Sequence, residues 1–164
     1  MTSQKGELTT DTSNLLILGS GSIARRELLS SVGLIPDAVE TPDVDESHKP
    51  NENPRHYVSR VARLKAGAIS CDKQSYLITA DTTVNVGKRF LVKTSNEVKA
   101  KEYLRLLSGR RHTVFTAFCV KHNDLIILKL VKTVLKMKLL TEEEIRSYIE
   151  SREWVGCAGA YSIQ

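Results

Sequence analysis

The chain has 164 residues, of which 41% are hydrophobic and 26% are charged. This length and composition are typical of one ordinary soluble domain with its own core, and the chain is too short for two domains of comfortable size. An aromatic content of 5% argues against a protein that stacks single-stranded bases. The net charge of +5 favours anionic partners in general, although a scattered basic surface without a function explains it equally well. Because the basic residues form no arm or tail, we expect no nucleic acid among the partners.

The cysteines indicate the compartment. Cys71, Cys119 and Cys157 lie far apart without a Cys-x-x-Cys pair, which predicts neither a disulfide framework nor a zinc site and fits a cytoplasmic protein. Residues 1–13 contain no apolar core of a signal peptide and are expected to form a disordered leader ahead of a domain over 14–164. No run approaches the length of a membrane span, so no membrane partner is expected.

The first predicted elements are a strand and a helix. Residues 15–18 predict a short buried strand that ends at a glycine. Ser22 is expected to cap a helix that runs to about Val32, and Gly33 is expected to end that helix. The following segment, 35–52, predicts a loop with at most one short strand.

A second helix is expected to begin at Asn53 and Pro54, because Asn caps helices and Pro is favoured at the first helical position. Its apolar residues are expected near one face, namely Val58, Val61, Leu64 and Ala68. Residues 75–87 then predict a strand that ends in a Gly-Lys turn.

The second half of the chain predicts a helix and then a hairpin. Ser95 is expected to open a third helix that stops at Ser108 and Gly109. Strands over 112–121 and 124–139 are expected to pair around His122-Asn123-Asp124, with the lysines of the second strand on a wet face. Thr141 and Glu144 form a capping-box pattern before a fourth helix over 142–154. The order predicts a single-domain α/β fold with a mixed sheet flanked by helices.

The stretch "GSGSIARR" after the first strand allows three interpretations. Free backbone N–H groups at a helix start, the hydroxyls of Ser20 and Ser22, and the nearby Arg25 and Arg26 suit a phosphate group. The pattern Gly-x-Gly-x-x-Ala also matches a dinucleotide fingerprint, which needs an acid about 20 residues further on; Glu40 is available, but its surroundings form a poor strand. A purely structural turn is the third interpretation, and this stretch alone does not decide between them.

Acidic residues mark two further places. The loop "DVDES" gathers Asp43, Asp45 and Glu46, which suits Mg²⁺ or, more commonly, is only a solvated acidic loop. In "ITADTTV", Asp81 lies on an apolar strand, where an unpaired carboxylate is costly. Asp81 is therefore a candidate metal ligand or a general base for water, or else a carboxylate that caps the turn.

Six segments carry a family resemblance: "LILGSGSIARRELL", "DVDES", "ARLKA", "TADTTV", "LSGRRHTVFTA" and "CAGAYSIQ". In this order and near this spacing, the chain resembles the Maf (septum-formation-inhibitor-like) nucleotide pyrophosphatases from about Leu15 to its last residue. The resemblance implies a cytoplasmic enzyme that uses a divalent metal, Mg²⁺ or Mn²⁺, and hydrolyses nucleoside triphosphates to the monophosphate and pyrophosphate. It also implies an α/β fold like that of the inosine triphosphate pyrophosphatases, and a possible homodimer.

The resemblance also implies residue roles. Asp81 matches the catalytic acid that activates water, and Glu46 would help Asp81 to hold the metal. The implied phosphate-binding residues are Ser20, Ser22, Arg25, Lys65 and Lys93. Thr82 and Gln164 match the specificity positions of the branch that acts on dTTP and UTP, whereas Ala24 stands where the family has an arginine linked to specificity.

The family continues beyond "AGAYSIQ" with a strand, a glycine-rich turn and a closing helix, so the domain over 14–164 is expected to lack that segment and to expose apolar surface. Two other functions stay open at this point. A non-catalytic nucleotide-binding or interaction protein would bind the ligand without cleaving it. A dinucleotide-dependent oxidoreductase is favoured only by the Gly-x-Gly-x-x-Ala pattern.

Overall fold

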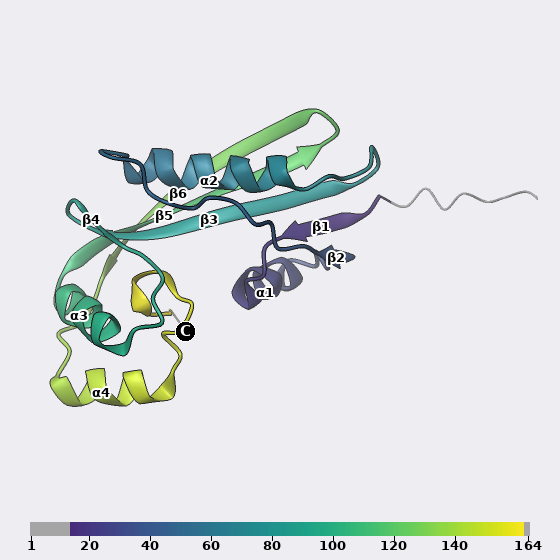
Figure 1. Cartoon of the computed structure of the whole chain (residues 1–164). Helices are drawn as coiled ribbons and strands as arrows, with labels where there is room; N and C mark the ends of the chain where they lie inside the picture. Colours follow the sequence, from purple (N-terminus) through teal and green to yellow (C-terminus); the bar gives the residue numbers. More distant parts are fainter. Residues whose placement is uncertain (1–13, 163–164) are drawn as a thin grey trace, which may run out of the picture.

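The computed structural model describes residues 14–162, and Figure 1 shows the arrangement of their helices and strands. The strands are β1 (Leu16–Gly19), β2 (Ala38–Val39), β3 (Tyr76–Val86), β4 (Arg89–Leu91), β5 (Arg111–His122) and β6 (Leu125–Lys136). The helices are α1 (Ile23–Ser31), α2 (Pro54–Ala68), α3 (Glu97–Leu107) and α4 (Glu142–Ser151), followed by the 3₁₀ turn η1 (Ala158–Ala160). The predicted leader, 1–13, and Gln164 lie outside the described residues.

All six strands belong to one sheet. Its order is β2-β1-β3-β5-β6, and β4 pairs with the last part of β3. β1 runs parallel to β2 and β3, whereas β5 runs antiparallel to β3 and to β6. The predicted α/β fold with a mixed sheet flanked by helices is therefore confirmed.

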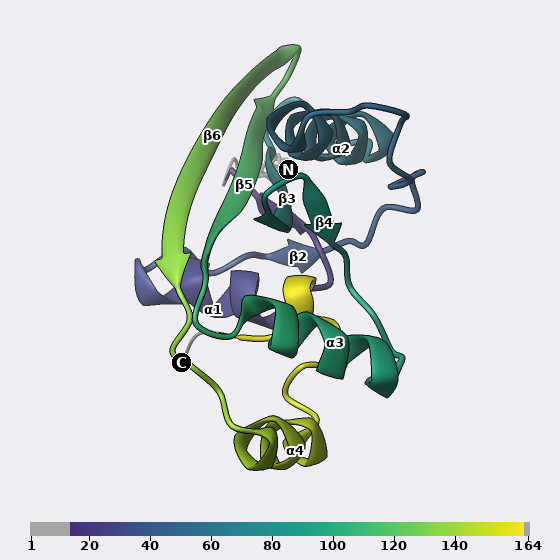
Figure 2. The same cartoon turned by 90° about the vertical axis from the view of Figure 1, so that its left-hand side faces the viewer.

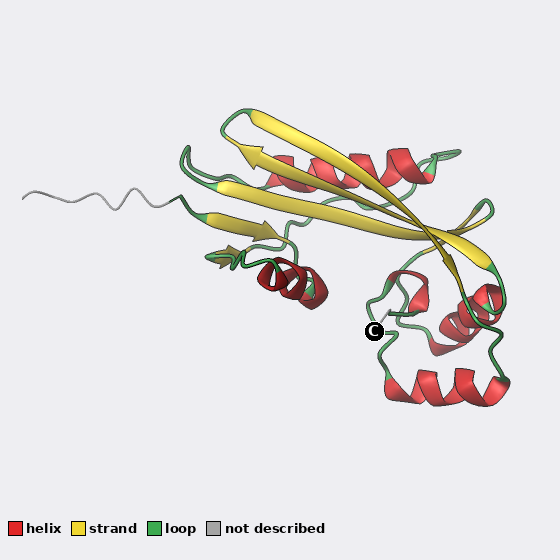
Figure 3. Ribbon diagram, turned by 180° about the vertical axis from the view of Figure 1, so that it is seen from behind, coloured by secondary structure: helices red, strands yellow, loops and turns green. Residues whose placement is uncertain are grey.

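The helices cover different parts of the sheet. α2 lies along one face and α1 lies on the opposite side, next to β1 (Figure 1, Figure 3). Figure 2 shows α3 and α4 gathered at one end, with the β5–β6 hairpin extending away from them. Two main cores result: one joins α2 to β5 around Val58, Val61 and Ala117, and the other joins α3, α4 and η1 around Leu104 and Trp154.

The start of α2 is as predicted, but its buried face is not. Asn53 Oδ1 accepts a hydrogen bond from the backbone N–H of Arg55 at 2.9 Å, which is an ordinary N-cap. Leu64, however, is 43% exposed, and Ala68 is also exposed. At 100° per residue, both positions lie well off the direction shared by Val58 and Ala62, and Lys65 takes a buried place instead.

The later elements differ from prediction at their ends. The N-cap of α3 is Asn96, one residue after the predicted Ser95, because the Asn96 side chain reaches the N–H of Lys99 at 3.0 Å. The capping box of Thr141 and Glu144 is confirmed. The hairpin turn is also confirmed, with Asn123 in the left-handed region at φ 53°.

The second hairpin strand was predicted with one wet face and one dry face. The structure ends β6 at Lys136, short of the predicted Leu139, and leaves Val131 49% exposed together with the lysines. The reason is that little of the chain packs over β6 apart from a small contact with α2, so a residue predicted for the dry face also meets solvent.

The edge of β3 next to β1 is interrupted. Pairing with β1 stops where Gly19 lies opposite Thr79, and pairing with β4 starts where Val84 lies opposite Leu91. Within the described chain, residues 80–83 therefore have no partner strand on this edge. We call this interval the β3 gap.

Candidate active site

The β3 gap presents Asp81 and Thr82 to opposite faces of the sheet, because successive side chains of a strand alternate. Asp81 contacts Lys65 of α2, whereas Thr82 contacts Arg25 of α1. The gap is thus the place where the turn after β1, the helix α2 and the centre of β3 meet.

The turn between β1 and α1 supplies hydroxyls and a guanidinium group. Arg25 donates from Nη1 to Ser20 Oγ at 2.8 Å and from Nη2 to Thr82 Oγ1 at 3.4 Å. Ser22 occupies the N-cap position of α1, as predicted, but its side chain makes no capping hydrogen bond. The Ser22 hydroxyl and the first N–H groups of α1 therefore stay available for an anion.

Gly19 lets this turn approach β3 closely. A Cβ atom at Gly19 would lie 2.6 Å from Thr79 Cγ2 and 2.8 Å from Ile69 Cδ1, closer than side-chain atoms pack. The first glycine of the predicted turn is thus required by packing between β1 and β3.

On the other face, a buried lysine joins two carboxylates. Lys65 Nζ lies 3.0 Å from Asp81 Oδ1 and 2.9 Å from Glu46 Oε1. The side chains of Lys65 and Asp81 are nearly buried, whereas that of Glu46 is 44% exposed. The structure therefore brings Lys65, for which the resemblance implied a phosphate contact, into an ion pair with Glu46 and Asp81, the two residues implied as metal ligands.

The second carboxylate oxygen of Asp81 has no partner. Asp81 Oδ2 is buried and makes no hydrogen bond, while Oδ1 is held by Lys65. Burial raises the pKa of Asp81 above its usual range, and the nearby Lys65 opposes this effect only in part. Burial likewise lowers the pKa of Arg25. A buried carboxylate with a free oxygen and a raised pKa is typical of a catalytic position.

A hollow of about 200 Å³ opens at this centre. Its lining includes Glu46, Asp81, Thr82 and Lys93, all of which are sequence-predicted site residues. Lys93 lies in the segment after β4, so that segment lines the cavity together with the acidic loop, α2 and β3, whereas Ser20, Ser22 and Arg25 are not among its lining residues.

Two aromatic side chains in this hollow were not predicted. The ring of His48 stacks on that of Tyr57 with 3.9 Å between centroids, and Tyr57 Oη donates to the backbone oxygen of Glu46 at 3.0 Å. Tyr57 thereby helps to fix the acidic loop against α2. The stacking depends on the path of the loop before α2, so no spacing in the sequence indicated it.

The donor set suits a hard divalent cation. Asp81 Oδ2 is an orphaned oxygen, and Glu46 provides a second carboxylate bound to the same lysine. In the described part of the chain, no group of three or more His, Cys, Asp and Glu side chains forms a complete metal cage. Mg²⁺ commonly uses one or two carboxylates and takes its other ligands from water and substrate phosphates, and the residues present fit that arrangement. Mn²⁺ prefers the same donors.

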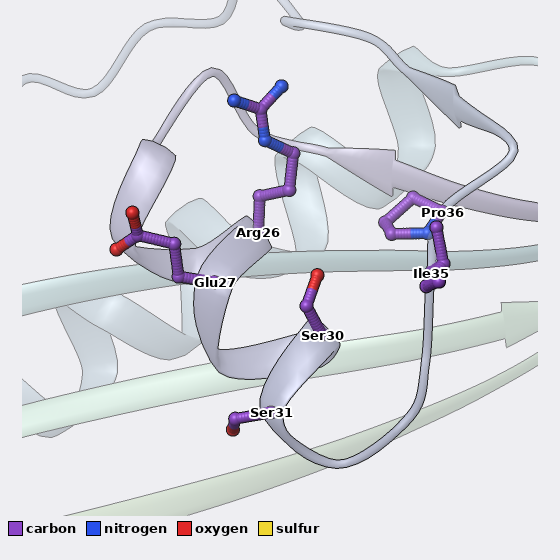
Figure 4. A pocket seen from close by; sticks show the side chains of 6 residues that line it. All are labelled: Arg26, Glu27, Ser30, Ser31, Ile35 and Pro36. Carbon is purple, nitrogen blue, oxygen red and sulfur yellow. The ribbon is translucent and has the colours of Figure 1, made fainter.

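Another hollow lies away from this centre. A space of about 460 Å³ lies beside α1, and Figure 4 shows that its side chains, including Arg26 and Glu27, point in different directions. None of its lining residues is a predicted site residue.

His112, at the helix–strand junction, is buried with Nε2 2.6 Å from Tyr161 Oη. Among residues 14–162, no helix is both long and apolar enough to cross a membrane.

The fold and the site together define an α/β protein with a buried carboxylate centre beside a strand-to-helix turn whose first N–H groups are free. Comparison with known proteins narrows this class, because the family model described as Maf-like protein matches residues 15–164. The chain belongs to the Maf family. The family resemblance in the sequence is thereby confirmed.

Individual relatives agree with this assignment. A protein named dTTP/UTP pyrophosphatase from Roseobacter denitrificans is 44% identical over 150 residues, which cover 92% of this chain and 80% of that protein. A protein of the same name from Maricaulis maris is 45% identical over 91% of this chain and 72% of its own length. Among solved structures, the Ham1 protein of Staphylococcus aureus gives a TM-score of 0.45 at 14% identity over 73% of this chain and 69% of its own.

Proposed function

We propose that the chain hydrolyses nucleoside triphosphates to the monophosphate and pyrophosphate, with dTTP and UTP as the preferred substrates. The observation that carries this proposal is the buried, unpartnered Asp81 Oδ2 at the β3 gap. Family membership supports the reaction, and the names of the relatives supply the two substrates.

The phosphate chain binds at the turn before α1. The Ser20 and Ser22 hydroxyls and the free N–H groups of α1 donate to phosphate oxygens, and Arg25 adds a positive charge. Lys93 lines the hollow and also binds the phosphates. Arg25 and Lys93 take up the charge that develops on the leaving pyrophosphate.

Asp81 acts as the general base. Lys65 holds Oδ1 at 3.0 Å and so fixes the carboxylate, and the carboxylate accepts a proton from the attacking water. Glu46 and Asp81 would hold a divalent metal, and such a metal, when bound, polarises phosphoryl oxygens as a Lewis acid. The raised pKa of Asp81 makes it a stronger base than an exposed aspartate.

Selection among nucleotides is assigned to Thr82, on the other face of β3. Thr82 Oγ1 lies 3.1 Å from Thr116 Oγ1 and accepts from Arg25, so its hydroxyl belongs to a fixed polar group. Gln164, the other predicted specificity position, stays a prediction because it lies outside the described residues. The cytoplasmic location, supported by the sparse unpaired cysteines, and the homodimer are likewise proposals.

The test is pyrophosphate release from dTTP, UTP, CTP, GTP and 7-methyl-GTP in the presence of Mg²⁺ or Mn²⁺. Asp81→Asn should retain the fold and lose about 10²-fold or more of the turnover. Asp124→Asn is the matched control, because Asp124 is an exposed acid in the β5–β6 turn.

Each result decides a separate question. Loss of turnover in Asp81→Asn alone supports the general-base role, and unchanged turnover rules it out. A folded wild-type protein that binds nucleotides and releases no pyrophosphate would instead establish a non-catalytic nucleotide-binding protein.

A further inference from the structure

A second polar hollow, of about 350 Å³, lies at the N-terminal end of α2. Its lining includes Arg55 from α2, Asn85 from β3, Arg111 and Phe115 from β5, and Lys132 from β6. It shares no lining residue with the hollow around Asp81. Asn85 follows Asp81 by four residues on the same strand, so about 13 Å of extended chain separate the two centres.

Strand register explains why these residues converge. Phe115 lies directly opposite Lys132, and Thr113 lies opposite both Asn85 and Val134. Directly paired residues share a face of a sheet. Asn85 also shares its face with Asp81, whose carboxylate meets Lys65 of α2. The hollow is therefore formed by the sheet face under α2 and by the first turn of that helix.

Two residues that line this hollow have buried polar atoms without a partner: His112, at Nδ1, and Asn85, at both ends of its amide. Asn85 is only 4% exposed, and neither Nδ2 nor Oδ1 has a hydrogen-bond partner. Buried amide groups are normally hydrogen-bonded because their desolvation is otherwise uncompensated. A side chain that offers both a donor and an acceptor to a cavity indicates a ligand with oxygen atoms.

The charges around the hollow have one sign. Arg55, Arg111 and Lys132 are exposed at its rim, and none of the described residues that line it is acidic. The N-terminus of the 15-residue helix α2 adds its partial positive charge. The surroundings therefore favour an anion over a neutral ligand.

We propose that this hollow is a binding site for a small phosphate-bearing anion, separate from the centre at Asp81. Asn85 Nδ2 donates to a phosphate oxygen, and Asn85 Oδ1 accepts from a protonated phosphate oxygen. The three cations neutralise the ligand. Inorganic phosphate and pyrophosphate share this chemistry, and neither binding event requires the proposed hydrolysis.

The experiment is an NMR titration of the ¹⁵N-labelled chain with inorganic phosphate and, in a second arm, with pyrophosphate. Ionic strength is held constant with KCl, because exposed charges are screened by salt. The reporter is the side-chain NH₂ signal of Asn85, identified from its loss in Asn85→Asp. The Arg25→Ala variant is titrated in parallel, since it disables the phosphate turn and leaves the second hollow intact.

We expect the Asn85 signal to shift with saturation in wild type and in Arg25→Ala. Binding should weaken by about tenfold in Arg111→Gln and in Lys132→Gln, because each loses a charge-assisted contact. Lys129→Gln is the control, as Lys129 is an exposed lysine of β6 outside the hollow. The arm that saturates at lower concentration identifies the ligand.

Two results would overturn the proposal. One is an Asn85 signal that does not move with either anion at constant ionic strength. The other is an equal weakening of anion binding in Lys129→Gln and Lys132→Gln. That result would mean that the general surface charge, and not a specific site, attracts the anion. Failure of the proposed function is a distinct result, because it is measured by pyrophosphate release rather than by this signal.

Discussion

Replacement of Lys65 by methionine tests the electrostatic balance at the centre of the site. Lys65 Nζ is the only direct cation contact that the described residues give Asp81, at 3.0 Å, and both side chains are nearly buried. Removing one partner of a buried ion pair costs about 3–5 kcal/mol, because the remaining charge stays buried. The contact with the partly exposed Glu46 adds at most about 1 kcal/mol. For a chain of this size, a loss of about 3 kcal/mol corresponds to a fall in Tm of roughly 6–12 °C.

The pH dependence gives a second readout. Burial holds the pKa of Asp81 above its usual value, and removal of Lys65 should raise it further. A group whose pKa is higher in the folded than in the unfolded protein binds more protons when folded, so its contribution to stability is lost as pH rises. The loss of free energy of unfolding in Lys65→Met should therefore be larger at pH 7.5 than at pH 5.

Urea unfolding in metal-free buffer measures both effects. Trp154 is the only tryptophan of the chain and is buried, so its fluorescence reports unfolding. The double variant Lys65→Met/Asp81→Asn should recover much of the stability, because it leaves no unpaired buried carboxylate. A single-variant loss below about 1 kcal/mol at both pH values, or a double variant no more stable than the single one, would refute this reasoning.

Two further variants test local features. Thr141→Ala removes the hydroxyl that accepts from the N–H of Glu144 and should lower the free energy of unfolding by about 1 kcal/mol, whereas Thr141→Ser should retain it; thermal melts of the two variants decide. Burial lowers the pKa of His112, so the unfolded chain binds more protons below about pH 6.5 and stability falls on acidification. Between pH 7.5 and 5.5, His112→Gln should lose less of its free energy of unfolding than the wild type does, as measured by urea unfolding. An equal loss in the two proteins would contradict this role of His112.

Local chemistry made most elements predictable. The cap at Asn53, the capping box at Thr141 and the Asn123 turn each depend on residues adjacent in the sequence. The choice of Ser95 over Asn96 as the start of α3 failed because both residue types cap helices. Leu64 was misplaced because hydrophobicity alone does not say which side of a helix meets the sheet.

The sequence predicted which residues belong to the candidate site better than it predicted how they are arranged. Asp81, Glu46 and Lys65 were all singled out, but their joint ion-pair arrangement depends on how α2 lies across β3. The stacking of His48 on Tyr57 depends on the path of a loop, which no periodic pattern encodes. Asn85 gave no local signal, since its significance comes from strand register and from the absence of a partner among the described residues.

The interrupted edge of β3 also affects how the site can change over time. Neighbouring codons specify Asp81 and Thr82, yet the packing of α2 constrains one side chain and the contacts with Arg25 and Thr116 constrain the other. A substitution at Thr82 therefore leaves the ion pair between Lys65 and Asp81 in place. With the roles proposed above, ligand preference could change through Thr82 while the ion pair that holds Asp81 is kept, although the two residues are adjacent in the chain.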